Sequence, residues 1–114
     1  MTQGKGFGFG LGKIKELQEA FQKAQQVQEQ AKVLQEELEN MVLEGKSADG
    51  LVTVQISGNQ EPKGISIDPA LLTKDVDTVC ATITEAMQTA YRESTETMRQ
   101  KMEDLTSGLN LPGL

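Results

Sequence analysis

The side chains in this chain that could do chemistry are lysines, arginines and carboxylates, because the usual catalytic residues are scarce. No histidine is present, so the commonest general base and metal ligand is missing. Cys80 is the single cysteine, so neither a disulfide nor a thiolate pair can form within the chain. It lies in an apolar helical stripe with Val76 and Ile83, which predicts a buried, inert thiol. We therefore expect no enzyme, no small-molecule substrate, no cofactor and no metal site.

A glycine-rich stretch near the start, GKGFGFGLGKIK, could suggest a phosphate-binding loop. Glycine occupies every even position from Gly4 to Gly12, whereas the GxGxxG and GxxxxGK loops need an odd separation and a preceding strand. The stretch is therefore not a nucleotide-binding motif. Five glycines in nine residues carry a large ordering entropy, which predicts a flexible tail over residues 1–11. Docking of Phe7 and Phe9, or contact between Lys5 and a phosphate, stays open as an alternative.

Charge is unevenly distributed along the chain, although the net charge is −6. Residues 1–35 carry five lysines against three glutamates, whereas the middle of the chain is acidic. If DNA is the partner, basic side chains must supply the phosphate contacts that dominate affinity. The candidates are Lys5, Lys13, Lys15, Lys23, Lys32, Arg92, Arg99 and Lys101. Lys13 and Lys15 are the strongest of them, although any single lysine could equally serve only to keep an exposed helix soluble.

The first long element is predicted to be a helix from about Gly12 to Asn40. From Leu17 to Met41, apolar residues recur at spacings of three and four, which is typical of a coiled-coil seam. The period then changes. Residues 41–46, 51–57 and 64–67 are predicted to be strands, joined by turns at Asp49-Gly50 and Gly58–Pro62. These strands form a three-stranded antiparallel meander.

A second long helix should follow, capped by Thr73 or Asp75 and ended by Ser107-Gly108. Its predicted core stripe includes Val76, Cys80, Ile83, Met87 and Ala90. The fold class is α+β, in the order helix, three strands, helix. A single domain would span residues 12–106, between flexible tails at 1–11 and 107–114.

The lengths of these elements favour a homodimer. A 29-residue helix is about 43 Å long and a six-residue strand about 20 Å, so each helix must extend well beyond the sheet. The apolar stripe on the extension would be exposed in a monomer. The chain lacks an 18-residue apolar run and a signal-peptide pattern, so we expect a cytoplasmic protein with no membrane partner.

Several segments together resemble the YbaB/EbfC family of bacterial nucleoid-associated DNA-binding proteins. They are the glycine-rich start, the Gln- and Glu-rich helix, VLEG at 42–45 followed by DGLVTV at 49–54, GISIDPALL at 64–72, and SGLNLP at 107–112. The resemblance covers nearly the whole chain, and its most specific part is the order GLV then IDPxLL between two long helices. Ala48 departs from it, since many relatives have glycine in that turn.

The resemblance implies a tweezer-like homodimer that binds duplex DNA at the nucleoid, alters DNA conformation and influences gene expression. The sequence contains no helix-turn-helix spacing, zinc ligand set or aromatic strand platform, which predicts weak or shape-based sequence preference. An alternative class remains open, because the net negative charge and alanine-rich seam also suit a helical scaffold that clasps protein partners.

Overall fold

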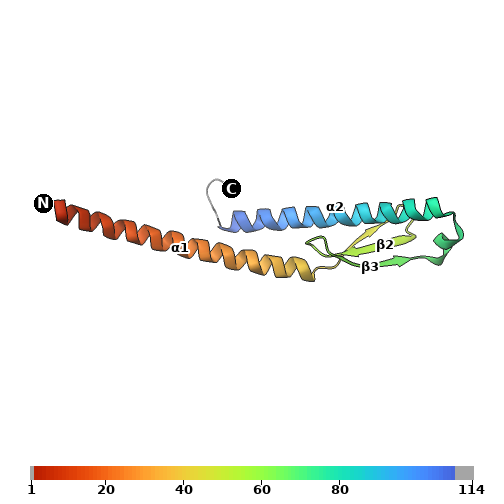
Figure 1. The fold of residues 1–114 in the computed structure, drawn as a ribbon, viewed down its shortest axis with the longest axis horizontal. Helices are drawn as coiled ribbons and strands as arrows, with labels where there is room; N and C mark the ends of the chain where they lie inside the picture. Colours follow the sequence, from red (N-terminus) through yellow and green to blue (C-terminus); the bar gives the residue numbers. More distant parts are fainter. Residues whose placement is uncertain (1, 110–114) are drawn as a thin grey trace. The chain divides into compact units, whose positions relative to one another are not determined.

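The structure is a computed structural model that describes the backbone of residues 2–109 and the side chains of residues 12–108. Its elements are helix α1 (Thr2–Asn40), strands β1 (Leu43–Lys46), β2 (Val52–Ile56) and β3 (Pro62–Ile67), the short 3-10 helix η1 (Pro69–Thr73) and helix α2 (Val76–Leu109) (Figure 1). The predicted α+β order is confirmed. The chain divides into two compact units, one ending at Lys32 and the other beginning at Val33.

Both helices are longer than predicted. α1 begins at Thr2 rather than at about Gly12, and α2 continues through Ser107 and Gly108 to Leu109. Glycine costs a helix about 1 kcal/mol per residue, but extending an existing helix requires no new nucleation, so glycines alone do not fix its end. The flexibility assigned to residues 1–11 and 107–114 stays a prediction. Residues 1 and 110–114 lie outside the described part of the chain.

The three strands form the predicted antiparallel meander in the order β1-β2-β3. Its first turn is closed by Gly50, whose φ of +74° is in the left-handed region that favours glycine. β3 begins at Pro62, earlier than predicted, because an edge strand can leave the missing N–H of proline facing away from its neighbour. Across the sheet, Gly45 pairs with Val54, and Val54 pairs with Ile65.

α2 packs on β1 and β2 through small residues. A Cβ added at Gly45 would lie 2.5 Å from the Cα of Ala90 and 2.7 Å from the carbonyl oxygen of Ala86. Both alanines are fully buried. Because strand and helix backbones approach so closely at this point, any side chain on Gly45 would force them apart.

The buried face of α2 differs from the predicted one. Ala86, Ala90 and Ser94 are fully buried, and Val79 and Ile83 pack beside them. Cys80 is exposed, so the prediction of a buried thiol was wrong. Val76 and Met87, predicted to be core residues, are also exposed. The helix therefore carries two adjacent apolar stripes, and its own sheet covers only one.

The last part of α1, residues 33–40, belongs to the second unit and contacts the turn between β2 and β3. The N–H of Gly58 donates to the carbonyl oxygen of Leu38 at 2.8 Å, which satisfies one of the free carbonyls at the helix end. Leu38 is buried, and its Cδ2 would lie 2.7 Å from a Cβ at Gly58. From α2, the Ser94 hydroxyl donates to the carbonyl oxygen of Ser57 at 2.8 Å. Glycine at this turn thus allows α1, the sheet and α2 to meet.

Candidate nucleic-acid interface

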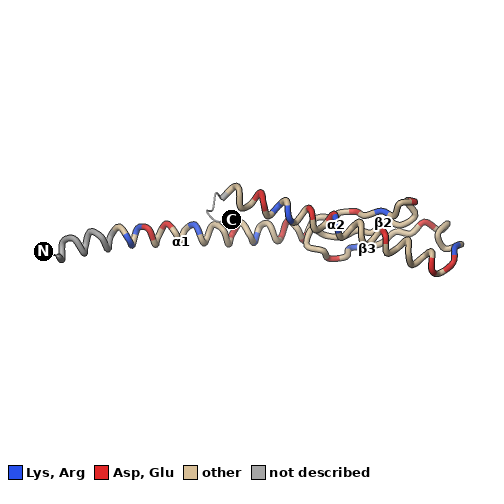
Figure 2. The backbone as a smooth tube through the Cα atoms, turned by 90° about the horizontal axis from the view of Figure 1, so that it is seen from above, with Lys and Arg blue, Asp and Glu red and all other residues tan. Residues whose placement is uncertain are grey.

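The lysines of α1 lie on the part of the chain with the most exposed side chains. Between Gly12 and Lys32, only Val27 and Gln30 are half-buried and every other residue is exposed. The candidate contacts Lys13, Lys15, Lys23 and Lys32 all belong to this exposed set. Figure 2 shows their positive charges alternating with the glutamates along α1. The side chain of Lys5 lies outside the described residues. We name residues 12–32 the arm.

Two basic candidates on α2 are engaged in ion pairs. The Arg99 guanidinium contacts a carboxylate oxygen of Glu96 and one of Glu103, each at 2.5 Å. The hydrogen bond to Glu96 and the two negative charges raise the pKa of Arg99. Lys101 donates to Glu37 at 2.8 Å, and this hydrogen bond raises the pKa of Lys101. A phosphate approaching either residue would have to compete with these carboxylates.

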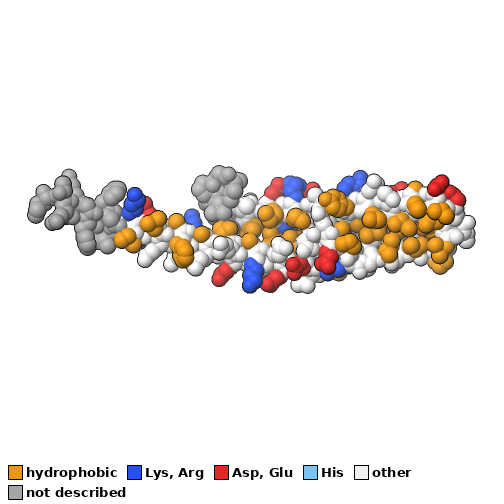
Figure 3. All heavy atoms as spheres, in the orientation of Figure 1, with side chains coloured by type: hydrophobic (Ala, Val, Ile, Leu, Met, Phe, Trp, Pro, Cys, Tyr) orange, Lys and Arg blue, Asp and Glu red, His pale blue; other side chains and the backbone are white. Residues whose placement is uncertain are grey.

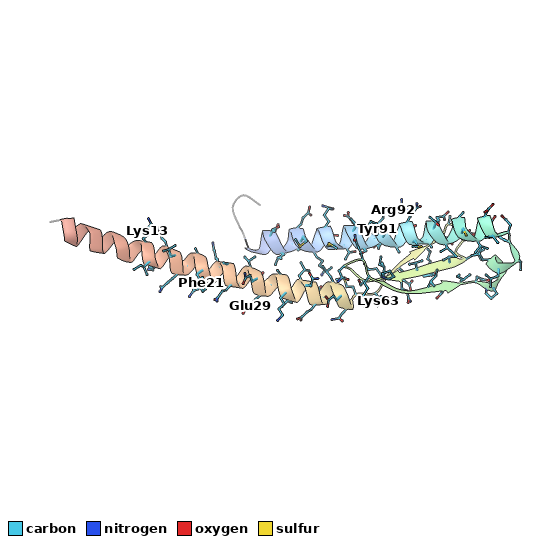
Figure 4. The ribbon with its side chains drawn as sticks, in the orientation of Figure 1. Lys13, Phe21, Glu29, Lys63, Tyr91 and Arg92 are labelled. Atoms are coloured by element: carbon cyan, nitrogen blue, oxygen red, sulfur yellow. The ribbon has the colours of Figure 1, made fainter. Side chains whose placement is uncertain are left out.

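Arg92, the third candidate on α2, lies beside a groove. Its Nη2 donates to the Thr89 hydroxyl at 3.4 Å. The groove has a volume of about 690 Å³. It is lined by the apolar residues Val54, Ile56, Pro62, Met87 and Tyr91 and by the polar residues Gln60, Thr84, Gln88 and Arg92 itself. Figure 4 labels Tyr91 and Arg92 on α2 next to the strands. Arg92 is therefore placed where a partner that fills the groove would also touch it.

The groove exists because α2 packs chiefly on β1 and β2 and leaves β3 uncovered. Burial decreases along the cross-strand row of Gly45, Val54 and Ile65, which are paired on β1, β2 and β3. Gly45 lies under α2, and Val54 is 7% exposed, whereas Ile65 is 51% exposed. Hydrophobic side chains gather over the strands and the adjoining part of α2 (Figure 3). Continuous exposed apolar surfaces of this kind are typical of interaction sites.

The exposed stripe of α2 extends that surface. Tyr91 and Met87 are each 54% exposed, and Val76 is 76% exposed. Sequence reasoning missed this surface because it took all apolar positions of α2 as one core stripe. The sequence did contain a signal for the buried side of α2. Ala86 and Ala90 are small enough to allow the close approach of Gly45, so they identify the side of α2 that meets the sheet.

Comparison with known proteins agrees with this architecture. The model of the YbaB/EbfC DNA-binding family matches residues 13–109. Nucleoid-associated proteins of Synechocystis and Microcystis aeruginosa are 75% and 71% identical over 114 residues, covering all of this chain and all of each relative. An uncharacterized protein of Helicobacter pylori shares the fold, with a TM-score of 0.66 and 21% identity over 72% of this chain and 87% of that one.

The chain belongs to the YbaB/EbfC DNA-binding family. This confirms the resemblance drawn from its sequence segments. Of the helices described between residues 2 and 109, none is long and apolar enough to cross a membrane.

Proposed function

We propose that this protein is a nucleoid-associated protein that binds duplex DNA as a homodimer. Its relatives over the full chain length are named nucleoid-associated proteins, and its family is described by DNA binding. We further propose that its sequence preference is weak or shape-based, and that binding alters DNA conformation and influences gene expression. No catalytic step and no cofactor enter this proposal.

The observation that supports DNA binding best is the exposed, lysine-bearing arm of α1. Lysines on a freely accessible helix can reach phosphates and release counterions, which supplies sequence-independent affinity. The arm holds four of them, Lys13, Lys15, Lys23 and Lys32. The acidic residues 36–91, by contrast, would repel phosphates, so the proposal assigns contact to the arm.

The apolar groove supports the homodimer part of the proposal. A stable protein interface buries about 800 Å² of each partner around an apolar centre with aromatic residues. The surface around Tyr91, Met87 and Ile65 offers such a centre next to the uncovered strand β3. A second copy of the chain presents the same surface in return, so a symmetric contact would cover both.

DNA binding is tested by a mobility shift on duplex DNA with the double variant Lys13→Glu/Lys15→Glu. The matched control is Lys46→Glu/Lys74→Glu, which makes the same charge change at exposed residues of the acidic part of the chain. We expect the arm variant to lose at least about tenfold in affinity and the control much less, since phosphate contacts dominate. Absence of wild-type binding even at about 50 mM salt would overturn the proposal, because electrostatic binding is strongest at low salt.

The homodimer is tested by sedimentation equilibrium of Met87→Glu. A carboxylate in the apolar groove would have to be desolvated on association, so we expect dimers to dissociate at micromolar concentration. Ala81→Glu is the control, because Ala81 is also exposed on α2 but lies about 120° from Met87 around the helix axis. A monomeric wild type, or a Met87→Glu variant that dimerises as the wild type does, would overturn this part.

A further inference from the structure

The carboxylates of the arm lie on one side of α1. At roughly 100° per residue, Glu16, Glu19 and Glu29 fall within an arc of about 140° around the helix axis. Glu19 lies near the middle of that arc. Lys15 and Lys23 lie inside it, each four residues from Glu19, the spacing at which helical side chains are neighbours.

The remaining arc of about 220° carries no carboxylate between residues 13 and 32. We call this side the carboxylate-free face. Its charged side chains are Lys13 and Lys32, and its other members are Ile14, Leu17, Gln18, Ala20, Phe21, Ala24, Gln25, Val27, Gln28 and Ala31. Figure 4 shows Lys13 and Glu29 on opposite sides of α1, as this division requires. Lys32 lies at the C-terminal boundary of this face, because Glu29 three residues before it and Glu36 four residues after it are its neighbours on the helix.

The exposed apolar side chains of the arm belong to the same face. Ile14 is 54% exposed, Leu17 64% and Phe21 65%. Gln25 and Gln28 are exposed beside them. Amide groups can hydrogen-bond to phosphates or to base edges, and apolar side chains can contact sugars, thymine methyl groups or base steps. A surface of lysine, glutamine and apolar residues without carboxylates is therefore suited to DNA.

We infer that duplex DNA contacts the carboxylate-free face of the arm, with Lys13 on a phosphate and Gln25 and Gln28 farther along the same face. This inference rests on the proposed DNA binding and specifies the surface that performs it. Lys15 and Lys23 are then peripheral, because bringing them to the duplex would also bring Glu16, Glu19 and Glu29 against the phosphates. The pairing of Lys13 with Lys15 stays a prediction, and this inference retains Lys13 from it.

The first test removes one positive charge from either side of the same helix. Lys13→Gln and Lys15→Gln change the net charge equally, and these exposed residues lie about 160° apart around the axis. We expect Lys13→Gln to weaken duplex binding several-fold and to lower the salt slope by about 1 for each arm that contacts the duplex, and Lys15→Gln to leave both nearly unchanged. Equal losses for the two variants would overturn the inference while leaving DNA binding intact.

The second test adds charge to either side. Gln28 and Gln26 are exposed, two positions apart in sequence and about 160° apart around the axis. We expect Gln28→Glu to weaken binding about tenfold and Gln28→Lys to strengthen it, with smaller effects of the same changes at Gln26. The gain from Gln28→Lys cannot come from misfolding.

The outcomes separate the possible failures. If the wild type does not bind duplex DNA, the proposed function fails. If it binds and the Gln28 and Gln26 variants respond alike, only the carboxylate-free face fails. If the Gln28 variants change the oligomeric state in sedimentation and leave DNA affinity unchanged, the face contacts another helix, and the inference is overturned in favour of a protein contact.

Discussion

The arm of α1 and the first half of α2 are both helices with apolar residues at helical spacing, yet their surroundings differ. On α2, Ala86, Ala90 and Ser94 are fully buried against the sheet and its turn. On the arm, Leu17 and Phe21 remain more than half exposed. Helical spacing therefore identifies an apolar face but not its partner. Residues 33–109 contain the buried side chains that stabilise the fold, whereas the apolar side chains Leu17 and Phe21 of the arm stay exposed.

The largest predicted effect comes from adding one methyl group where the helix and the sheet meet. Gly45→Ala should destabilise the protein by about 3 kcal/mol or more, because its Cβ would overlap the backbone of α2. The matched variant is Gly12→Ala on α1, where a Cβ meets nothing within 4 Å. It should not destabilise, since alanine is the better helix former. Urea unfolding at one fixed protein concentration measures both, and similar losses would contradict the comparison.

Truncating one leucine in each region tests the same difference in burial. Leu38→Ala should cost about 3 kcal/mol, because Leu38 is 4% exposed and packs against Gly58. Leu17→Ala removes the same atoms from a side chain that is 64% exposed, and should cost less than about 0.5 kcal/mol. Thermal or urea unfolding compares the two. A large loss at Leu17 would show that the arm is covered in the folded state.

A buried hydroxyl provides a smaller effect. Ser94→Ala should cost about 1–2 kcal/mol, because the Ser57 carbonyl oxygen loses its buried donor from α2. Thr95→Ala is the control, since Thr95 accepts an exposed hydrogen bond from Gln60 on the same turn. Equilibrium unfolding of both variants tests the difference, and equal costs would argue against a structural role for the buried bond.

The smallest effect is a pH dependence at the start of α2. The Thr78 hydroxyl donates to Asp75 at 2.5 Å, and this bond holds the pKa of Asp75 below its ordinary value of 3.8. A depressed folded-state pKa stabilises the protein above pH 3.8, and this contribution is lost as the pH falls through the folded-state pKa.

Asp75→Asn keeps an N-cap acceptor but does not titrate. The free energy of unfolding of this variant should therefore decrease less than that of the wild type as the pH falls below about 4. Asp77→Asn, in the same turn, is the control for removing one charge. Urea unfolding measured across this pH range would give parallel curves for Asp75→Asn and the wild type if the interpretation is wrong.

Much of the fold could be predicted from the sequence because the elements are long and change period clearly. The alternation of Val52, Val54 and Ile56 predicted β2, and all three are buried. The side of α2 that meets the sheet could not be read from its apolar spacing. Cys80 and Ile83 lie on the same half of the helix, and only the close approach of Gly45 decides which one packs inward.

The eight basic candidates were named from the sequence, but their surroundings were not predicted. The ion pairs of Arg99 with Glu96 and Glu103 depend on rotamers as well as on spacing. The pairing of Lys101 with Glu37 joins positions far apart in the chain and leaves no local signal. The groove beside Tyr91 depends on which strand α2 leaves uncovered, which is a property of packing.

We propose that the arm, rather than α2, supplies the phosphate contacts. The most direct test measures the DNA association constant as a function of salt for Lys13→Gln/Lys32→Gln and for Arg99→Gln/Lys101→Gln, which each remove two positive charges. We predict that the arm variant lowers the magnitude of the log–log salt slope by about 2 or more, and that the α2 variant leaves it close to the wild-type value. An unchanged slope for the arm variant, with a lowered slope for the α2 variant, would contradict the claim.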